Sequence, residues 1–416
     1  MASVIPHIID QHAEEAAFLW LLRNNAVDAP HYDLDDLAKL DDRVEAHIDG
    51  LRIAGDYGWQ ACLDNLQFKE AGEVFAAAVL ALESHSAERI NHIYKIVEEA
   101  PEAINGLVSA FGWVGAENLQ GTVKGLLEST KPIWRRIGLS ACSIHRVDPK
   151  KILDVAVQDD DIEVRVQALR LVGELGRLDL KPVLLEQLKD EDKQIKFWAA
   201  WSAVLVGDRG SAVHSLINEI ESGSEYCISA MQLILPLLNS QSVKKTLKVL
   251  ADNKETLRLA IMGSGISGDT IYVPWLIQQM SDPEHAKIAG EAFSHLCGVD
   301  LAYQDMEAEL AESESFGPTE NPDDEEVAMD PDEDLPCPDP VLVQKWWQEN
   351  SDKFRAKLGY RYIYGKQSSQ SHYQWLLKNG TQRLRYSAAL ALALLNPEAV
   401  LFEVHAVGKR QQKALV

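Results

Sequence analysis

A small residue recurs at an almost constant interval inside apolar helical stretches of this chain. Six such positions are separated by 29 to 31 residues, namely Gly138, Ala168, Ala199, Ala230, Ala260 and Ala289. A fixed period of this length is typical of repeat proteins, in which each unit packs only against its neighbours. We therefore predict that helices press together at these positions in an array covering roughly residues 66 to 300.

Each repeat contains two apolar runs separated by a short break. In one copy the first run is Val164–Gly176, the break is Gly176–Arg177, and the second run is Pro182–Leu188. Mostly acidic stretches between copies, such as Asp159–Asp161 and Lys189–Asp192, suit helix starts because carboxylates accept hydrogen bonds from free amides there. The predicted unit is two helices joined by a tight turn.

The flanks of the array differ from it in composition. An amphipathic stretch from Ile5 to Arg23 predicts a helix that caps the array, and Gln382–Leu390 looks like a last repeat copy. We predict an all-α, HEAT-like helical-repeat solenoid with a helical cap in front and a helical block behind. The predicted parts are a cap at 1–65, the array at 66–300, an acidic flexible loop at 301–340, and an aromatic and basic helical block at 341–416.

Residues 305–339 hold 15 acidic side chains and no basic one. Few apolar groups accompany them, so burial would not offset the entropy lost on ordering the segment. The prediction is a flexible, solvated loop. Its acidic runs lack the spacing and the glycine of an EF-hand calcium loop.

The block 341–416 is the most unusual surface candidate. Residues 346–375 contain 8 of the 30 aromatic residues, and the block as a whole contains 12 basic and 4 acidic residues. The rings could fill a joint between a returning helix and the array, or they could form a binding hot spot, for which Trp, Tyr and Arg are the favoured residues. The candidate partner-binding residues are Trp346, Trp347, Tyr360, Arg361, Tyr362 and Trp375.

The pattern Val-Arg-x-x-Ala-x-x-x-Val-Gly-x-Leu-Gly at 164–176 resembles the short HEAT-like repeat that also occurs in phycobilin lyases. The likeness covers about two thirds of the chain. It implies a helical solenoid, but no lyase activity follows, because such folds bind many unrelated partners.

A second resemblance rests on the order of motifs along the chain. These are Asp41–Leu51, Phe293–Leu301 ahead of the acidic segment, Trp346–Trp347, Gly359–Tyr362, and the stretch from Arg385 to Leu392. The order resembles an uncharacterised proteobacterial family that is often encoded beside type VI secretion genes. This resemblance implies an accessory or effector-loading role.

Charge and composition narrow the possible partners and the compartment. The formal charge of −24 repels a phosphate backbone, so nucleic acid is not expected as a partner. No run approaches the ~20 apolar residues of a membrane span, and the acidic N-terminus is unlike a secretory signal, so we expect a cytoplasmic protein without a membrane partner. The five cysteines contain no CxxC pair, which argues against a disulfide framework or a zinc ribbon.

Signatures of catalysis are missing from the sequence. It has no phosphate loop, no HExxH and no GxSxG, and we expect no cofactor, no metal site and no catalytic residues. The glycine-rich run Met262–Gly268 is predicted to be a turn between two helices. His47 and the acidic residues near it are predicted to be ordinary surface residues. The expected function is a non-catalytic scaffold or adaptor whose partner is another protein. An immunity protein that neutralises a toxin is an alternative, and a HEAT-like DNA glycosylase is less favoured because the predicted second helices carry mixed charges.

Overall fold

The computed structural model describes residues 5–308, 330, 332–354 and 360–416. The chain is an all-α helical-repeat protein, which confirms the predicted fold class. It divides into two compact units. Unit 1 comprises residues 1–183, 378–382 and 398–416, and unit 2 comprises residues 184–377 and 383–397.

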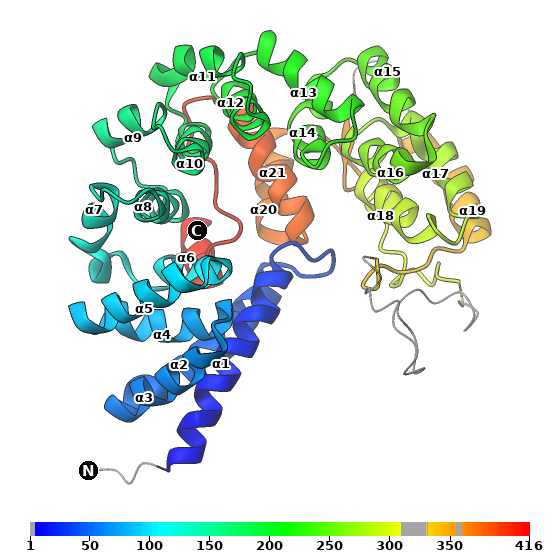
Figure 1. Ribbon diagram of the computed structural model, residues 1–416. Helices are drawn as coiled ribbons and strands as arrows, with labels where there is room; N and C mark the ends of the chain where they lie inside the picture. Colours follow the sequence, from blue (N-terminus) through cyan, green and yellow to red (C-terminus); the bar gives the residue numbers. More distant parts are fainter. Residues whose placement is uncertain (1–4, 309–329, 331, 355–359) are drawn as a thin grey trace. The chain divides into compact units, whose positions relative to one another are not determined.

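Unit 1 combines the N-terminal helices, the first repeats and the last helix of the chain. Its helices are α1 (Pro6–Ala26), α2 (Leu34–Ala54), α3 (Asp56–Asn65), α4 (Ala71–Glu83), α5 (Ala87–Glu99), α6 (Ile104–Trp113), α7 (Thr122–Leu127), α8 (Pro132–His145), α9 (Lys151–Ala156), α10 (Ile162–Glu174) and α22 (Gly408–Ala414). Helices α5, α7 and α9 lie in one row, and α6, α8 and α10 lie in a second row beside the C-terminal segment (Figure 1). Helix α11 (Lys181–Gln187) spans the boundary between the units.

Unit 2 continues the helix pairs and adds a short hairpin. Its elements are α12 (Lys193–Leu205), α13 (Ser211–Glu221), α14 (Cys227–Ile234), α15 (Ser240–Ala251), α16 (Leu257–Ile266), α17 (Val273–Gln279), α18 (Ala286–Cys297), α19 (Pro340–Asn350), β1 (Tyr362–Ile363), β2 (Lys366–Gln367) and most of α20 (Gln370–Asn379) and α21 (Gln382–Leu395). Short 3₁₀ turns occur in both units, at Leu66–Phe68, Pro101–Ala103, Ala116–Leu119, Leu178–Leu180, Leu235–Leu237, Lys254–Thr256, Thr270–Tyr272 and Ser351–Phe354.

The periodic small residues lie where the sequence predicted them. Each sits in the first helix of its pair and is buried, and the five alanines have no exposed surface. Predicted caps are also present, because Asp161 accepts a hydrogen bond from the amide of Val164 and Asp192 accepts one from Ile195. The predicted period and the predicted caps are therefore confirmed.

The prediction for the glycine-rich run Met262–Gly268 is wrong. Most of the run belongs to α16, and the turn begins at Ser267. A Cβ atom at Gly265 would lie 2.8 Å from Cα of Ala292, so the glycine lets α16 and α18 approach closely. Close packing, and not backbone freedom, explains the glycines within this helix.

The predicted acidic loop is described at its two ends, whereas residues 309–329 and 331 lie outside the described residues. The amide of Ala308 donates to the carbonyl of Cys337 over 2.9 Å, and the amide of Asp339 donates to Met306 over 2.7 Å. Asp332 accepts two hydrogen bonds from Arg258, at 2.5 and 2.6 Å. These contacts fix both ends of the segment within unit 2.

The hairpin of β1 and β2 was not expected from the sequence. Its amides at Tyr364 and Gly365 donate to the carbonyls of His295 and Leu296, over 2.6 and 3.0 Å. Those carbonyls lie in the last turn of α18, where no further helical amides are available to them. The hairpin therefore completes the hydrogen bonding of a helix end.

Residues 398–416, predicted to belong to the block 341–416, lie in unit 1. The amide of Leu401 donates to the carbonyl of Glu174 over 2.8 Å, and Nε of Arg146 donates to the carbonyl of Leu401 over 2.8 Å. The amide of Gly408 donates to a carboxylate oxygen of Asp41 over 2.6 Å. The segment thus contacts α10, α8 and α2 in turn.

Candidate functional site

Three of the six predicted partner-binding residues lie together in a packed aromatic cluster. Trp346, Trp347 and Tyr362 surround the buried ring of Phe354, with ring centroids 6.2, 5.7 and 5.4 Å from it. Trp346 also meets the edge of Phe293 in α18, at 5.6 Å. Because all three rings are partly buried against this core, they contribute to the packing of unit 2.

Arg361 is also held within unit 2. Its Nη1 donates to Asp269 over 3.0 Å, and its Nη2 donates to the carbonyl of Leu238 over 2.7 Å. The guanidinium therefore joins the start of the hairpin to the breaks after α14 and α16. With 12% of its side chain exposed, Arg361 offers little surface.

Tyr360 and Trp375 are the most accessible of the six, with exposed fractions of 39% and 41%. The indole of Trp375 stacks on His372 at 5.8 Å, and the ammonium of Lys366 lies 5.3 Å from its ring centre. An exposed ring beside a cation matches the composition of binding hot spots. The predicted partner-binding role of all six residues stays a prediction.

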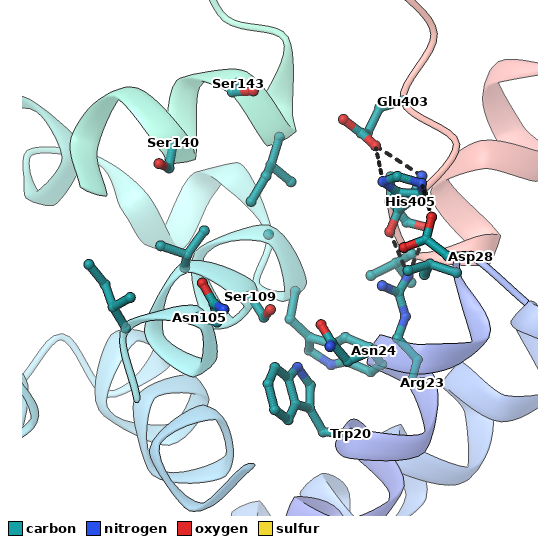
Figure 2. A pocket seen from close by; sticks show the side chains of 18 of the residues that line it. Trp20, Arg23, Asn24, Asp28, Asn105, Ser109, Ser140, Ser143, Glu403 and His405 are labelled. Atoms are coloured by element: carbon teal, nitrogen blue, oxygen red, sulfur yellow. Dashed lines mark hydrogen bonds and ion pairs between the residues drawn. The ribbon is translucent and has the colours of Figure 1, made fainter. Parts of the chain in front are cut away.

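A second candidate site, a cavity of about 460 Å³ in unit 1, was not foreseen from the sequence. Helices α1, α6, α8 and α10 line it, together with residues 403–407 of the C-terminal segment. Figure 2 shows that Trp20, Asn105 and Ser109 approach it from α1 and α6, and that Glu403 and His405 lie across from them. The cavity therefore lies between the helix row of α6, α8 and α10 and the C-terminal segment.

Two indoles that line the cavity belong to an aromatic stack. Phe75 of α4 stacks on Trp20 at 5.7 Å and meets Trp113 edge to face at 5.3 Å. The indole nitrogen of Trp113 donates to Glu45 over 2.6 Å. These contacts fix both rings, so this part of the cavity is shaped before any ligand arrives.

The charged side chains around the cavity are paired within the protein. Arg23 donates to Asp41 over 2.9 Å and to the carbonyls of His405 and Ala406 over 2.7 and 3.0 Å. Glu403 pairs with Arg146 over 2.6 Å. Burial alone would raise the pKa of Glu403, but the positive charge of Arg146, with His405 and the hydrogen bond from its amide, together outweigh burial and hold that pKa below its usual range.

Deeper in the same region, Glu174 of α10 is buried between two arginines. It pairs with Arg146 at 3.1 Å and with Arg170 at 2.9 Å, and it accepts a hydrogen bond from the hydroxyl of Ser143. Arg170 and Ser143 themselves line the cavity. The cationic side chains of this wall are therefore neutralised by acids from the same unit.

Several neutral polar side chains of the cavity remain available. Within the described part of the chain, no hydrogen-bond partner occurs for the side chains of Asn24, Asn105, Ser109 and Gln167, all of which line the cavity. Each amide side chain offers a carbonyl acceptor and an NH₂ donor. These groups can serve a polar, uncharged ligand.

His47, predicted to be an ordinary surface residue among acids, instead faces His12 of α1. The two Nδ1 atoms are 3.1 Å apart, and burial, together with the charge of His12, lowers the pKa of His47. Across the described ranges, no three His, Cys, Asp or Glu side chains gather as metal ligands would. The helices that the structure describes include none long and apolar enough to cross a membrane.

Comparison with known protein families finds one match. The family described as HEAT repeats matches residues 149–218, which run from α9 to α13 and include Gln167 and Arg170 of the cavity. The match supports a HEAT-like repeat protein. The comparison with curated proteins and the comparison with solved structures each give no match.

Proposed function

We propose that this chain is a non-catalytic scaffold or adaptor that binds another protein. The observation that carries the proposal is the stacking of helix pairs, with a HEAT-repeat match at residues 149–218. Repeat proteins of this kind present extended surfaces, and HEAT repeats commonly mediate protein binding. The acidic formal charge of −24 favours a protein partner over nucleic acid.

The finer proposal is an accessory or effector-loading chaperone of type VI secretion, acting in the cytoplasm. It is supported by the motif order from Asp41–Leu51 to the stretch from Arg385 to Leu392, which resembles a family often encoded beside those genes. An immunity protein would bind its partner through the same kinds of contact, but that partner would be a toxin, which it would neutralise. The identity of the bound protein separates these two roles.

Within the predicted partner-binding set, Tyr360 and Trp375 are the residues that we propose to contact the partner directly. Their exposed fractions of 39% and 41% leave area that a partner can desolvate. Trp346, Trp347, Arg361 and Tyr362 support that surface from within unit 2, because their rings and guanidinium hold the hairpin and α19 in place.

The test is affinity capture from the native organism with the tagged full-length chain, followed by mass spectrometry. One protein should be enriched over a tag-only control, and Trp375→Ala should weaken its capture while lowering the melting temperature only slightly, through loss of the stack on His372. Tyr57→Ala removes a ring that is 62% exposed in α3 and serves as the matched control. If no protein is retained by the parent chain, the scaffold function is wrong, and protection of cells from a captured toxin would favour the immunity role.

A further inference from the structure

We infer that the cavity of unit 1 binds a short extended segment of the partner protein through the main chain of that segment. This inference rests on the proposed function, since it names where and how a bound protein is recognised. The site is the one lined by α1, α6, α8, α10 and residues 403–407. It is separate in the sequence from the six partner-binding residues predicted in 341–416.

Side chains of unit 1 at and beside the cavity already donate hydrogen bonds to main-chain carbonyls of the C-terminal segment. Residues 398–403 form no helix or strand, and long side chains donate to carbonyls of this segment and its continuation. Arg146 donates to Leu401, Arg23 donates to His405, and Gln411 donates to Val404 over 2.8 Å. Recognition of backbone carbonyls by side-chain donors is thus built into this part of unit 1.

Three neutral polar side chains around the cavity have no hydrogen-bond partner among the residues that the structure describes. Asn24 on α1, Asn105 on α6 and Gln167 on α10 line the cavity from three helices, and no hydrogen bond to their side chains occurs within the described residues. A peptide main chain alternates one donor and one acceptor per residue. Side-chain amides carry the same two groups and can therefore pair with it at successive positions.

The paired charges around the cavity favour an uncharged main chain over an anionic ligand. Arg136, which also lines the cavity, pairs with Glu163 at 3.1 Å, and Arg170 pairs with Glu174. A phosphate or carboxylate ligand would have to compete with these carboxylates for the guanidinium groups. An uncharged main chain needs no such exchange.

The size and the polar lining of the cavity also suit a peptide segment. Its volume of about 460 Å³ lies within the ~300–1,000 Å³ of typical ligand sites. Sites for compact small molecules are mostly apolar, whereas most side chains that line this cavity are polar. Trp113, Val108 and Ile144, which are partly exposed, add a limited apolar surface suited to one side chain of the bound segment.

The test uses the full chain and short synthetic peptides tiled across the protein retained in the capture experiment. At least one peptide should bind the parent, with affinity measured by fluorescence anisotropy. The double variant Asn105→Ala with Gln167→Ala should bind that peptide about tenfold more weakly, the loss expected when two hydrogen bonds disappear. Asn218→Ala, which removes an exposed amide from α13 in unit 2, should bind like the parent.

A second variant blocks the cavity without removing an amide. Ser109→Trp places an indole in the cavity and should abolish peptide binding while the circular dichroism spectrum stays that of the parent. Unchanged affinity in both cavity variants would overturn the site and leave the scaffold function standing. If the intact partner binds but none of its peptides does, the extended-segment inference is wrong, and if the parent retains no protein at all, the proposed function itself has failed.

Discussion

Gly298→Ala should destabilise unit 2 by displacing the hairpin from the end of α18. Gly298 has a φ of 67°, in the left-handed region, and the hairpin backbone lies directly over it. A Cβ atom there would lie 2.6 Å from the carbonyl carbon of Tyr364 and 2.8 Å from the nitrogen of Gly365. Both are backbone atoms, so no side-chain rotation can relieve the overlap.

The magnitude follows from three contributions. A side chain in the left-handed conformation costs about 1 kcal/mol. Overpacking costs roughly 1–3 kcal/mol, and the two amide hydrogen bonds to His295 and Leu296 contribute about 1 kcal/mol each if they break. The overlap is relieved either by strain or by loss of those bonds, so the expected total is about 3 kcal/mol.

The matched control is Gly207→Ala, at the end of α12 in the same unit. Its φ is 87°, but an added Cβ atom would meet Pro397 at 3.4 Å, an ordinary contact. This variant should therefore lose about 1 kcal/mol from backbone strain alone. Denaturant unfolding followed by tryptophan fluorescence measures both, and equal destabilisation of the two variants would refute the seating of the hairpin on Gly298.

Further predictions concern packing, exposure and pH. Ala199→Glu should lower the free energy of unfolding by at least ~3 kcal/mol because it buries an unpaired charge at a position with no exposed surface. As a control, Gln194→Glu on the exposed face of α12 should leave the denaturant midpoint unchanged. Trp346→Ala should lower the melting temperature through lost packing against Phe293 and Phe354, while Trp375→Ala, which loses a half-exposed ring, should lower it less; the opposite order would exchange their roles. Burial lowers the pKa of His295 to about 4, so the unfolded chain, with an ordinary pKa near ~6.5, takes up the proton first as pH falls. Stability should decline by up to ~3 kcal/mol from pH ~6.5 to ~4 in urea titrations, and His295→Gln should flatten that decline.

The repeats could be predicted because the pattern that specifies each helix pair lies within a short stretch of sequence. Ala168 and Ala199 each lie in an apolar stripe of the same period, and a buried small residue at a helix contact follows directly from that pattern. The glycines at 263 and 265 misled the prediction because glycine serves both turns and close helix contacts. Choosing between these uses requires knowing that Ala292 lies opposite, which the local sequence does not contain.

The candidate sites were harder to predict for a related reason. Trp346 and Trp375 are chemically identical, and what separates them is contact with Phe293 in one case and exposure in the other. The cavity is assembled from helices distant in sequence, with Asn105 and Gln167 on different repeats. No spacing rule joins such residues, so only the folded arrangement reveals that their amides share a cavity.

The return of residues 398–416 to unit 1 sets an order of events during synthesis. Unit 1 begins to leave the ribosome first. Its hydrogen bonds from Gly408 to Asp41 and from Arg146 to Leu401 cannot form until all of unit 2 has been translated. One wall of the cavity, at residues 403–407, is equally late. Domains generally fold in the order in which they leave the ribosome, so unit 2 can fold while unit 1 is still incomplete. A nascent chain therefore lacks the finished cavity until synthesis has passed residue 407, which delays its competence to capture a partner segment until translation is nearly over.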